Sequence, residues 1–303
     1  SDMLSLNQSY MLFHLAERLK EMHLAHQPLP ALLKQKTVSL LFEKPSTRTR
    51  VSFDAGIHLL GGHSLFIDKQ TTQMGRGEDW RDTAMTLSQY TDCIMARVFE
   101  HKELEVMAKY SNKPVINGLT NEDHPCQILS DFFTIREHFG RLGGITVLYA
   151  GVADNITDSL LVAASILGAN IWVASPNEFP VSRKYLVKAT HFAKKTGADI
   201  RTFTEMPTPE LLKQVNVVYT DEWESMHMKL DKKKLFPHLI KFQLNEKLLS
   251  KCARGAMGMH CLPAIKGEEV SQSVMYAKNS LVWTQAQNRM YVQMALLSAL
   301  LKN

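Results

Sequence analysis

The sequence predicts an α/β protein made of two tandem domains, each a mostly parallel sheet flanked by helices. The chain has 303 residues, which is enough for about two domains with separate cores. Short apolar runs alternate with stretches of helical periodicity, and this alternation predicts right-handed crossovers and sheets covered on both faces. The alternation is interrupted at Arg141-Leu-Gly-Gly144, a turn that we interpret as a hinge.

The first domain is expected over residues 3–140, completed by the chain's last helix, 286–303. It opens with an amphipathic helix over residues 8–24, with Tyr10, Met11, Leu15, Leu19 and Met22 on one face. Strands are expected at 38–42, 64–67, 93–99 and 115–117. Helices are expected at 79–89, 104–110 and 125–139. Another is expected before Gly61-Gly62, with Val51, Ala55, Leu59 and Leu60 recurring at helical spacing.

The second domain is expected over residues 141–285 and repeats the plan of the first. Strands are predicted at 145–150, 170–174, 200–203, 215–219 and 257–261, and helices at 156–167 and 182–196. A final helix at 286–301 is expected to pack back on the first domain. Gly151-Val-Ala-Asp-Asn155 follows a strand without matching GxGxxG, which argues against a dinucleotide site.

Composition narrows the class of protein. The 45% hydrophobic and 21% charged content is typical of a soluble globular protein, and the net charge of +5 is too mild and dispersed to indicate nucleic acid. No apolar run approaches the roughly 18 residues of a membrane span. The four cysteines, Cys93, Cys126, Cys252 and Cys261, lack CxxC spacing. They indicate reduced thiols in a cytoplasmic protein, with no disulfide framework and no zinc site.

The stretch Phe42–Phe53, FEKPSTRTRVSF, carries the first candidate site. An apolar strand precedes it and a helix begins within it, so backbone N–H groups and the positive end of the helix dipole point at one spot. Ser46, Thr47 and Thr49 add hydroxyl donors, and Arg48 adds a forked cation suited to phosphate. An ordinary helix cap formed by Ser46 is the alternative, but it rarely needs so many hydroxyls and arginines. We therefore expect an anion cradle.

Two further clusters lie where predicted strands end. In Asp123-His-Pro-Cys-Gln127, the proline fixes a helix start, which places His124 and Gln127 one turn apart. A histidine and an amide at a helix N-terminus suit a polarised carbonyl group, although capping is an equally good explanation of this cluster alone. In Met259-His-Cys-Leu-Pro263, an apolar strand breaks into a loop, and a core cysteine is the simpler interpretation there.

Together these motifs resemble the signature set of the aspartate/ornithine carbamoyltransferase family, and within it the ornithine-specific members. FEKPSTRTR, HPCQ and HCLP occur in the family's order, and the resemblance runs from about Leu6 to Leu301. Further matching segments are Gln73–Glu78, Asp82–Ala84, Arg97, Asn155, Asp221–Met226 and Gln287–Arg289.

The resemblance implies that the anion is carbamoyl phosphate. Its phosphate would be held by Ser46, Thr47, Arg48 and Thr49, with added charge from Arg97 and Arg289. The carbamoyl end would meet His124 and Gln127, together with Thr49 and Arg97. In family trimers, a glutamine from the neighbouring subunit reaches the phosphate, and Gln73 matches it. We expect Arg50 to support the cradle through an ion pair.

The resemblance also implies that L-ornithine is the acceptor, bound by the second domain. Asn155, Asp221, Ser225 and the backbone N–H of Met226 match the positions that hold its α-amino and α-carboxylate groups. Cys261 and the Leu262 carbonyl would meet the δ-amine. A thiolate-capable Cys261 could accept or relay a proton, while Arg97 and His124 stabilise the oxyanion. The product would be L-citrulline, and neither a metal nor a cofactor is implied.

Alternatives differ in the acceptor or in catalysis itself. Another amine, such as putrescine, acetylornithine or lysine, is the nearest alternative, whereas Cys261 and Asp221 disfavour aspartate. A non-catalytic regulatory or scaffolding homologue is opposed by the completeness of the motifs. One departure concerns His227, which replaces the glycine of the family's Ser-Met-Gly motif. Glycine permits positive φ at low cost, so His227 bears on the geometry of the acceptor loop, although a tolerated side chain that faces solvent is the favoured interpretation.

Overall fold

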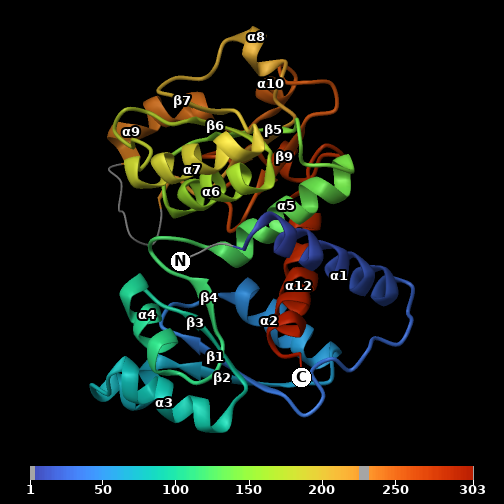
Figure 1. The fold of residues 1–303 in the computed structure, drawn as a ribbon. Helices are drawn as coiled ribbons and strands as arrows, with labels where there is room; N and C mark the ends of the chain where they lie inside the picture. Colours follow the sequence, from blue (N-terminus) through green and yellow to red (C-terminus); the bar gives the residue numbers. More distant parts are fainter. Residues whose placement is uncertain (1–3, 225–231, 303) are drawn as a thin grey trace. The chain divides into compact units, whose positions relative to one another are not determined.

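The computed structural model describes residues 4–224 and 232–302, and confirms the α/β class with two parallel sheets (Figure 1). The chain forms two compact units. One contains residues 7–126 and 288–303, and the other contains residues 1–6 and 127–287. We call them the four-stranded and the five-stranded unit after their sheets. The functional domain limits given above stay a prediction.

The four-stranded unit has the strand order β2-β1-β3-β4, with every neighbouring pair parallel. Its strands are β1 (Thr37–Phe42), β2 (His63–Asp68), β3 (Cys93–Arg97) and β4 (Val115–Leu119). Its helices are α1 (Leu6–Leu24), α2 (Thr47–Leu59), α3 (Trp80–Tyr90) and α4 (His101–Tyr110), with two 3₁₀ turns, η1 (Lys69–Thr71) and η2 (Gln73–Arg76). The central position of β1 brings the end of this strand next to the end of β3, where Phe42 pairs with Arg97.

The last helix, α12 (Val282–Leu300), returns to the four-stranded unit as predicted. It packs closely on α2, since a Cβ added to Gly56 would lie 2.8 Å from the Met294 side chain. Lys20 of α1 is buried and donates to Asn288 Oδ1 at 2.8 Å. Residues from both ends of the chain therefore build one core.

The five-stranded unit has the parallel order β7-β6-β5-β8-β9. Its strands are β5 (Thr146–Ala150), β6 (Asn170–Ala174), β7 (Ile200–Phe203), β8 (Val217–Thr220) and β9 (Met257–His260). Its longer helices are α5 (Pro125–Phe139), α6 (Asn155–Leu167) and α7 (Arg183–Thr196). Sequence analysis did not predict the short elements α8 (Pro209–Leu212), α9 (Lys232–Leu239), η3 (Ile240–Phe242), α10 (Glu246–Leu249) and α11 (Gln272–Met275).

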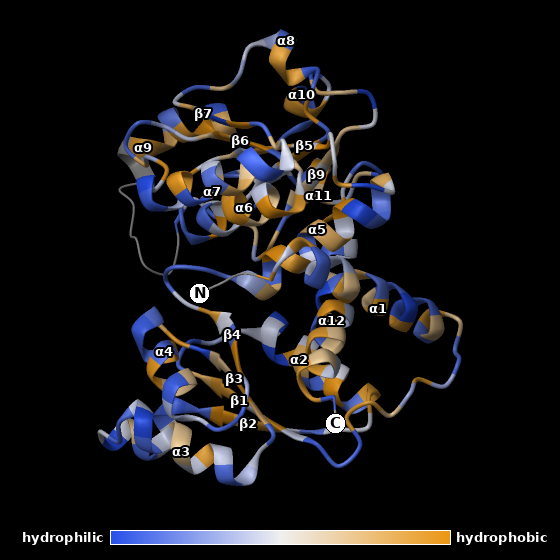
Figure 2. Cartoon of the chain, in the orientation of Figure 1, coloured by the Kyte–Doolittle hydropathy of each residue, from blue (hydrophilic) through white to orange (hydrophobic). Residues whose placement is uncertain are grey.

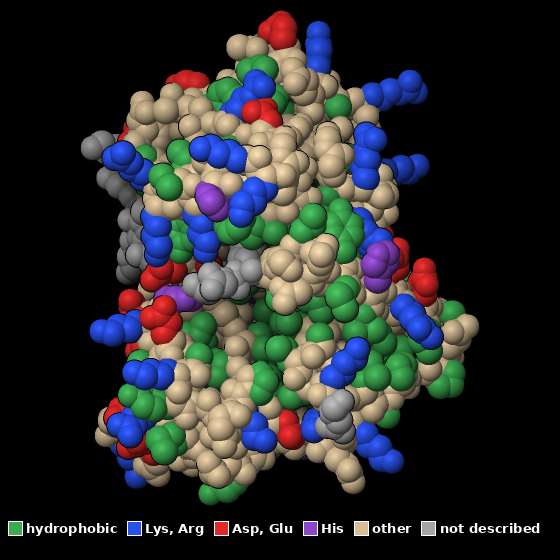
Figure 3. Space-filling view, viewed as in Figure 1, with side chains coloured by type: hydrophobic (Ala, Val, Ile, Leu, Met, Phe, Trp, Pro, Cys, Tyr) green, Lys and Arg blue, Asp and Glu red, His purple; other side chains and the backbone are tan. Residues whose placement is uncertain are grey.

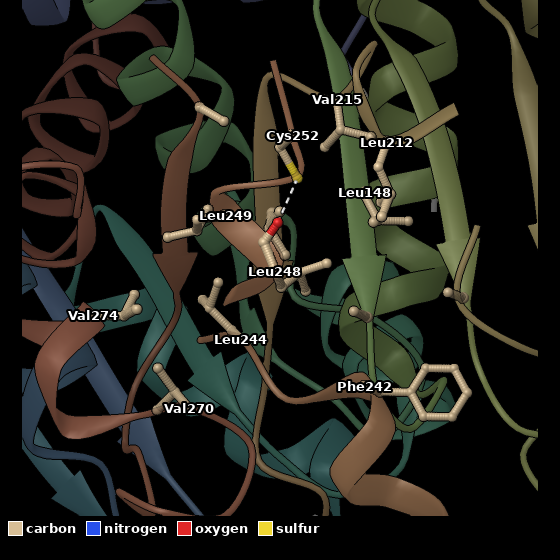
Figure 4. Packing of buried hydrophobic residues seen from close by; sticks show 14 of the residues in the cluster. Leu148, Leu212, Val215, Phe242, Leu244, Leu248, Leu249, Cys252, Val270 and Val274 are labelled. Carbon is tan, nitrogen blue, oxygen red and sulfur yellow. Dashed lines mark hydrogen bonds between the residues drawn. The ribbon is translucent and has the colours of Figure 1, made fainter. Parts of the chain in front are cut away.

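One face of this sheet is covered by α8, η3, α10 and α11 (Figure 4). Leu148 of β5 packs among Leu212, Phe242 and Leu248. Cys252 belongs to this core, where its thiol donates to the Leu248 carbonyl at 3.3 Å. The apolar strands and the apolar inner faces of the helices are visible in Figure 2. All four cysteines are free and buried.

The predicted buried faces of two helices were only partly right: Leu19 and Leu60 are buried as expected, whereas Met11 and Val51 are exposed. In α1, Met11 is 70% exposed, and the buried residues are Ser9, Leu12, Phe13, Ala16, Leu19 and Lys20. In α2, Val51 is 57% exposed, and the buried residues are Thr49, Phe53, Gly56 and Ile57. Both buried faces include polar or small residues that contact α12 or, like Thr49, serve the site described below.

Lysine and arginine side chains are scattered among acidic and neutral ones on the face seen in Figure 3, in keeping with the dispersed charge of the sequence. Among the helices of the described residues, none is both long and apolar enough to cross a membrane.

Candidate functional site

The turn between β1 and α2 forms the predicted cradle. Ser46 is the N-cap of α2 with extended backbone (φ −162°), and its hydroxyl accepts from the Thr49 N–H at 3.3 Å. The capping interpretation is therefore correct as far as it goes. Ser46 and Thr47 also line a cavity of about 780 Å³, so the turn is open to a ligand as well as capped.

Arginines from two other elements converge on Thr49, which is fully buried. Arg289 of α12 donates to Thr49 Oγ1 at 2.7 Å, and Arg97, the last residue of β3, donates to the same oxygen at 3.5 Å. Burial, Arg289 and Arg48 together lower the pKa of Arg97 to about 10. Arg97 Nε is buried without a hydrogen-bond partner among the described residues. Arg48, Arg97 and Arg289, three of the predicted phosphate ligands, thus form one cluster of positive charge.

His124 lies in the field of this cluster. Burial, followed by Arg289, Arg97, Arg48 and Lys44, lowers its pKa well below the usual value. The imidazole is therefore neutral at physiological pH and can donate only one ring N–H. Lys44, which sequence analysis did not single out, is 1% exposed and hydrogen-bonds to Asn121. Burial and Arg97 are the main causes that lower its pKa to about 8.

Arg50 and Gln73 lie apart from this cluster. Arg50 is exposed on α2 and stacks on Phe66, with its guanidinium carbon 3.6 Å from the ring centroid. The predicted ion pair of Arg50 is wrong, since the described residues give it an aromatic partner and no carboxylate. Gln73 is exposed on η2, and no hydrogen bond joins its side chain to the cradle within the described chain.

In the five-stranded unit, Asp221 and Cys261 are brought together because they follow β8 and β9, which are neighbouring parallel strands. The Cys261 thiol donates to Asp221 Oδ1 at 2.9 Å, and the Glu222 N–H donates to the same oxygen at 2.8 Å. Asn155 begins α6, after β5, the other neighbour of β8. The strand ends thus gather three of the predicted acceptor residues in one unit.

Asp221 shares this environment with Asp154, which sequence analysis missed. Asp154 caps α6 by accepting from the Ile156 and Thr157 N–H groups, and burial raises its pKa to about 6. Burial and then Asp154 raise the pKa of Asp221 well above its usual value. A signal was present, since Asp154 lies two residues before the helix predicted at 156–167, and an aspartate at a helix start is a typical N-cap.

Cys261 is a protonated thiol in this arrangement, and its predicted part in proton transfer stays a prediction. Burial, the charge of Asp221 and the hydrogen bond to it raise the pKa of Cys261 well above the usual thiol value. A carboxylate that accepts the S–H bond stabilises the protonated sulfur. In this arrangement the thiol therefore stays protonated and hydrogen-bonded to Asp221.

The loop after Cys261 is held in one conformation. Leu262 has a positive φ of 63°, and its N–H donates to His260 Nδ1 at 2.9 Å. The other ring nitrogen of His260 lies 3.1 Å from Glu269 Oε1, and both side chains are fully buried. The Ile265 N–H donates to the same Glu269 oxygen at 2.6 Å. These bonds fix the direction of the peptide groups around Leu262.

A metal ion would fit this loop poorly. Asp221, His260 and Cys261 have potential ligand atoms within 4.8 Å of one another. Both ring nitrogens of His260, however, already face the partners named above, so coordination would break a buried hydrogen bond. Ser225 and Met226, predicted to bind the acceptor, lie outside the described residues, as does His227.

Gln127 belongs to a buried network on α5 within the five-stranded unit. Its Nε2 donates to Asp131 Oδ1 at 2.8 Å, and the two residues are 1% and 0% exposed. Asp131, four residues further along α5, was not predicted. The i,i+4 spacing from Gln127 on a confidently predicted helix was the signal available for it.

Comparison with known proteins agrees with these motifs. Residues 1–137 match the family model for the carbamoyl-phosphate binding domain of aspartate/ornithine carbamoyltransferase, and residues 143–300 match the model for its Asp/Orn binding domain. An ornithine carbamoyltransferase from Aquifex aeolicus is 44% identical over 89% of this chain and 87% of its own length. One from Pyrococcus abyssi is 42% identical over 89% of this chain and 84% of its own length.

A solved structure is also similar over nearly all of the chain. The ornithine carbamoyltransferase from Pyrococcus furiosus has a TM-score of 0.92 at 39% identity, covering 98% of this chain and 94% of that one. Two family models that span most of the sequence, together with relatives above 40% identity, establish the relationship. This chain belongs to the aspartate/ornithine carbamoyltransferase family.

Proposed function

We propose that the protein transfers the carbamoyl group of carbamoyl phosphate to the δ-amine of L-ornithine, giving L-citrulline and phosphate. The observation that carries the proposal is the convergence of Arg97 and Arg289 on Thr49 at the N-terminus of α2. Like charges held together in a buried place need an anion between them, and a helix N-terminus provides the matching backbone donors.

On the donor side, Ser46, Thr47, Arg48 and Thr49 hold the phosphate, assisted by Arg97 and Arg289. His124 and Gln127 bind the carbamoyl group. Because the pKa of His124 is lowered, its neutral ring can donate to the carbamoyl oxygen without charging. The attraction between the surrounding positive charges and that oxygen increases as the oxyanion develops. This favours the transition state over the bound substrate.

On the acceptor side, Asn155, Asp221, Ser225 and the Met226 N–H bind the α-amino and α-carboxylate groups, and Cys261 with the Leu262 carbonyl meets the δ-amine. The amine nitrogen attacks the carbamoyl carbon, a C–N bond forms, and the C–O bond to phosphate breaks. The proton lost by the amine is balanced by the one that the released phosphate takes up. Most of the acceleration comes from orienting two substrates.

The charge around Asp221 favours an amine as the acceptor. The two neighbouring carboxyl groups of Asp154 and Asp221, whose pKa values are both raised, favour a ligand with an amino group beside them. The relatives reported above are named ornithine carbamoyltransferases, which favours ornithine among the possible amines. Putrescine lacks the α-carboxylate for which the Ser225–Met226 segment is proposed.

We further propose a homotrimer in which Gln73 of one subunit reaches the cradle of the next. Two features support it. Gln73 is exposed on η2, away from the cradle of its own chain, and the cavity beside Ser46 and Thr47 is lined partly by outward residues such as Val51 and Arg50. The four free, buried thiols accord with a cytoplasmic location.

Citrulline formation tests the proposal directly. The purified protein is incubated with both substrates and with each omitted, and citrulline and phosphate are measured over time. Stoichiometric appearance of both products only in the complete mixture is expected. A folded oligomer that forms no citrulline contradicts the proposal, and a higher kcat/KM with putrescine, acetylornithine or lysine would reassign the acceptor. Analytical ultracentrifugation distinguishes a trimer from other assemblies.

A further inference from the structure

Asp131 is a buried carboxyl group that collects three side-chain donors inside the five-stranded unit. Gln127 and Gln285 each donate from Nε2 to Oδ1 at 2.8 Å, and the Tyr219 hydroxyl donates to Oδ2 at 2.8 Å. All four residues are at most 1% exposed. A buried carboxylate with three directed donors is an expensive arrangement unless something depends on its geometry.

The network fixes which end of the Gln127 amide faces Asp131. A carboxylate accepts hydrogen bonds and does not donate them, so the NH₂ group of Gln127 must point toward it. The opposite end of the amide, the Oε1 acceptor, is thereby directed away from Asp131. An amide rotated by 180° would place two acceptor oxygens together, which is strongly unfavourable in a buried site.

The same carboxylate is tied to the end of β9. Gln285, which donates to Asp131, accepts the His260 N–H through Oε1 at 3.1 Å, and His260 directly precedes Cys261. Gln285 Nε2 also lies 3.2 Å from the Tyr219 hydroxyl. Asp131 is therefore held from three sides and cannot turn to accommodate a different orientation of Gln127.

We propose that Asp131 is a positioning and specificity residue that makes Gln127 present its oxygen to the donor substrate, so that the site selects a carbamoyl NH₂ over a methyl group. The inference rests on the proposed function, in which Gln127 binds the carbamoyl end. Acetyl phosphate has the same phosphate and carbonyl as carbamoyl phosphate but carries CH₃ where the latter carries NH₂. An amide oxygen pairs with the NH₂ and is left without a partner by the CH₃.

The test compares how carbamoyl phosphate, acetyl phosphate and inorganic phosphate bind, using thermal-shift titrations that need no acceptor. The wild-type protein is expected to bind carbamoyl phosphate at least tenfold more tightly than acetyl phosphate. In Asp131→Asn the neighbouring amide can rotate, because asparagine offers both a donor and an acceptor, and this ratio should fall about tenfold. Phosphate, which meets only the cradle, should bind within about twofold of wild type.

A double-variant cycle separates positioning from a general structural effect. Gln127→Met should lower the same ratio, and adding Asp131→Asn to it should produce no further fall, because Asp131 acts through Gln127. Thr134→Val is the matched control. It alters a fully buried residue of the same helix, whose hydroxyl donates to the Ser130 carbonyl at 2.8 Å, and it should leave the ratio unchanged.

The outcomes are distinct. If the wild-type protein binds neither acyl phosphate, the proposed function fails. If it binds carbamoyl phosphate but Asp131→Asn keeps the wild-type ratio, or if the effects of the two variants add, the role of Asp131 is overturned. Should Asp131→Asn not fold, Asp131→Ser takes its place with the same fall expected, because a hydroxyl can both donate and accept and so does not fix the amide.

Discussion

The cradle of the four-stranded unit and the acidic site of the five-stranded unit are built on opposite charges but by the same rule. In the cradle, buried cations lie together, and the pKa values of Arg97, Lys44 and His124 are lowered. In the acidic site, carboxyl groups lie together, and the pKa values of Asp154 and Asp221 are raised. Each site holds like charges in partial desolvation, which costs stability until a ligand of opposite charge is bound.

We infer that each site discriminates between ligands first by their charge and then by their shape. Under the proposed function, a phosphate would relieve the repulsion in the first site, and an amino group would relieve it in the second. Neither ligand suits the other site. The opposite pKa shifts of the two sites therefore match a reaction between an anionic donor and an amine acceptor.

The largest expected effect comes from breaking the cationic side. Arg48→Ala removes a charge that acts on both Arg97 and His124, and kcat/KM for carbamoyl phosphate should fall on the order of 10²- to 10⁴-fold because a charge-assisted contact to the reacting group is lost. Steady-state citrulline assays measure it. Arg18→Ala, on the exposed side of α1, is the matched control and should retain wild-type kinetics. A change of less than tenfold in Arg48→Ala would show that the cradle has been misassigned.

Breaking the acidic side should affect the other substrate. Asp221→Asn is expected to lower kcat/KM for ornithine about 100-fold while changing phosphate binding little. It should also lower the pKa of Cys261, because Asp221 raises it by charge and by accepting the S–H bond. The pH dependence of alkylation of Cys261, followed by peptide mass spectrometry, should therefore move to lower pH. An unchanged alkylation profile would contradict the hydrogen-bonded pair.

The smallest expected effect is a change in the free energy of unfolding caused by the buried carboxyl group of Asp154. The pKa of Asp154 is about 6 in the folded protein, against an ordinary value of 3.8. The raised value means that the charged form is disfavoured on folding, so the penalty is absent below pH 3.8 and grows as pH rises through about 6. Asp154→Asn keeps an N-cap residue and removes this penalty. It should raise the free energy of unfolding by about 1–3 kcal/mol at pH 8, and less at pH 5.

Urea denaturation at the two pH values measures this difference. Asp79→Asn is the matched control, since Asp79 is also an N-cap, accepting from the Asp82 N–H at 2.8 Å, but lies exposed on α3. A gain in stability that is equal at both pH values, or equal in the control, would show that buried charge is not its cause.

Sequence reasoning succeeded where the signal was local or carried by a motif. The strand–turn–helix at Ser46 depends on neighbouring residues, and α5 begins at Pro125 because proline fits the first helical turn. Alternation predicted the parallel strands, whose ends agree for β1, β5, β6 and β7 and differ by one or two residues in the others. Motif resemblance supplied Arg97 and Arg289. The contact of Arg289 with Thr49 joins residues 240 positions apart and could not be read from any local pattern.

It failed where tertiary contacts decide which residues are buried. Val51 and Met11 looked like core residues because they are apolar, yet the buried faces of α2 and α1 contain Thr49 and Lys20. Those polar groups are buried because distant partners, Arg289 and Asn288, satisfy them. Asp131 escaped notice for the same reason, since its three donors come from α5, β8 and α12.

The return of α12 to the four-stranded unit has a consequence for biosynthesis. Translation delivers residues 7–126 first, but Arg289, Met294 and Asn288 leave the ribosome only after the whole five-stranded unit. Until then, Gly56 has no helix against it and Lys20 lacks its Asn288 partner. The nascent first unit can form its sheet but not its finished core, so it exposes apolar surface for the time taken to make about 160 residues, an interval of roughly 10–30 s at ordinary translation rates.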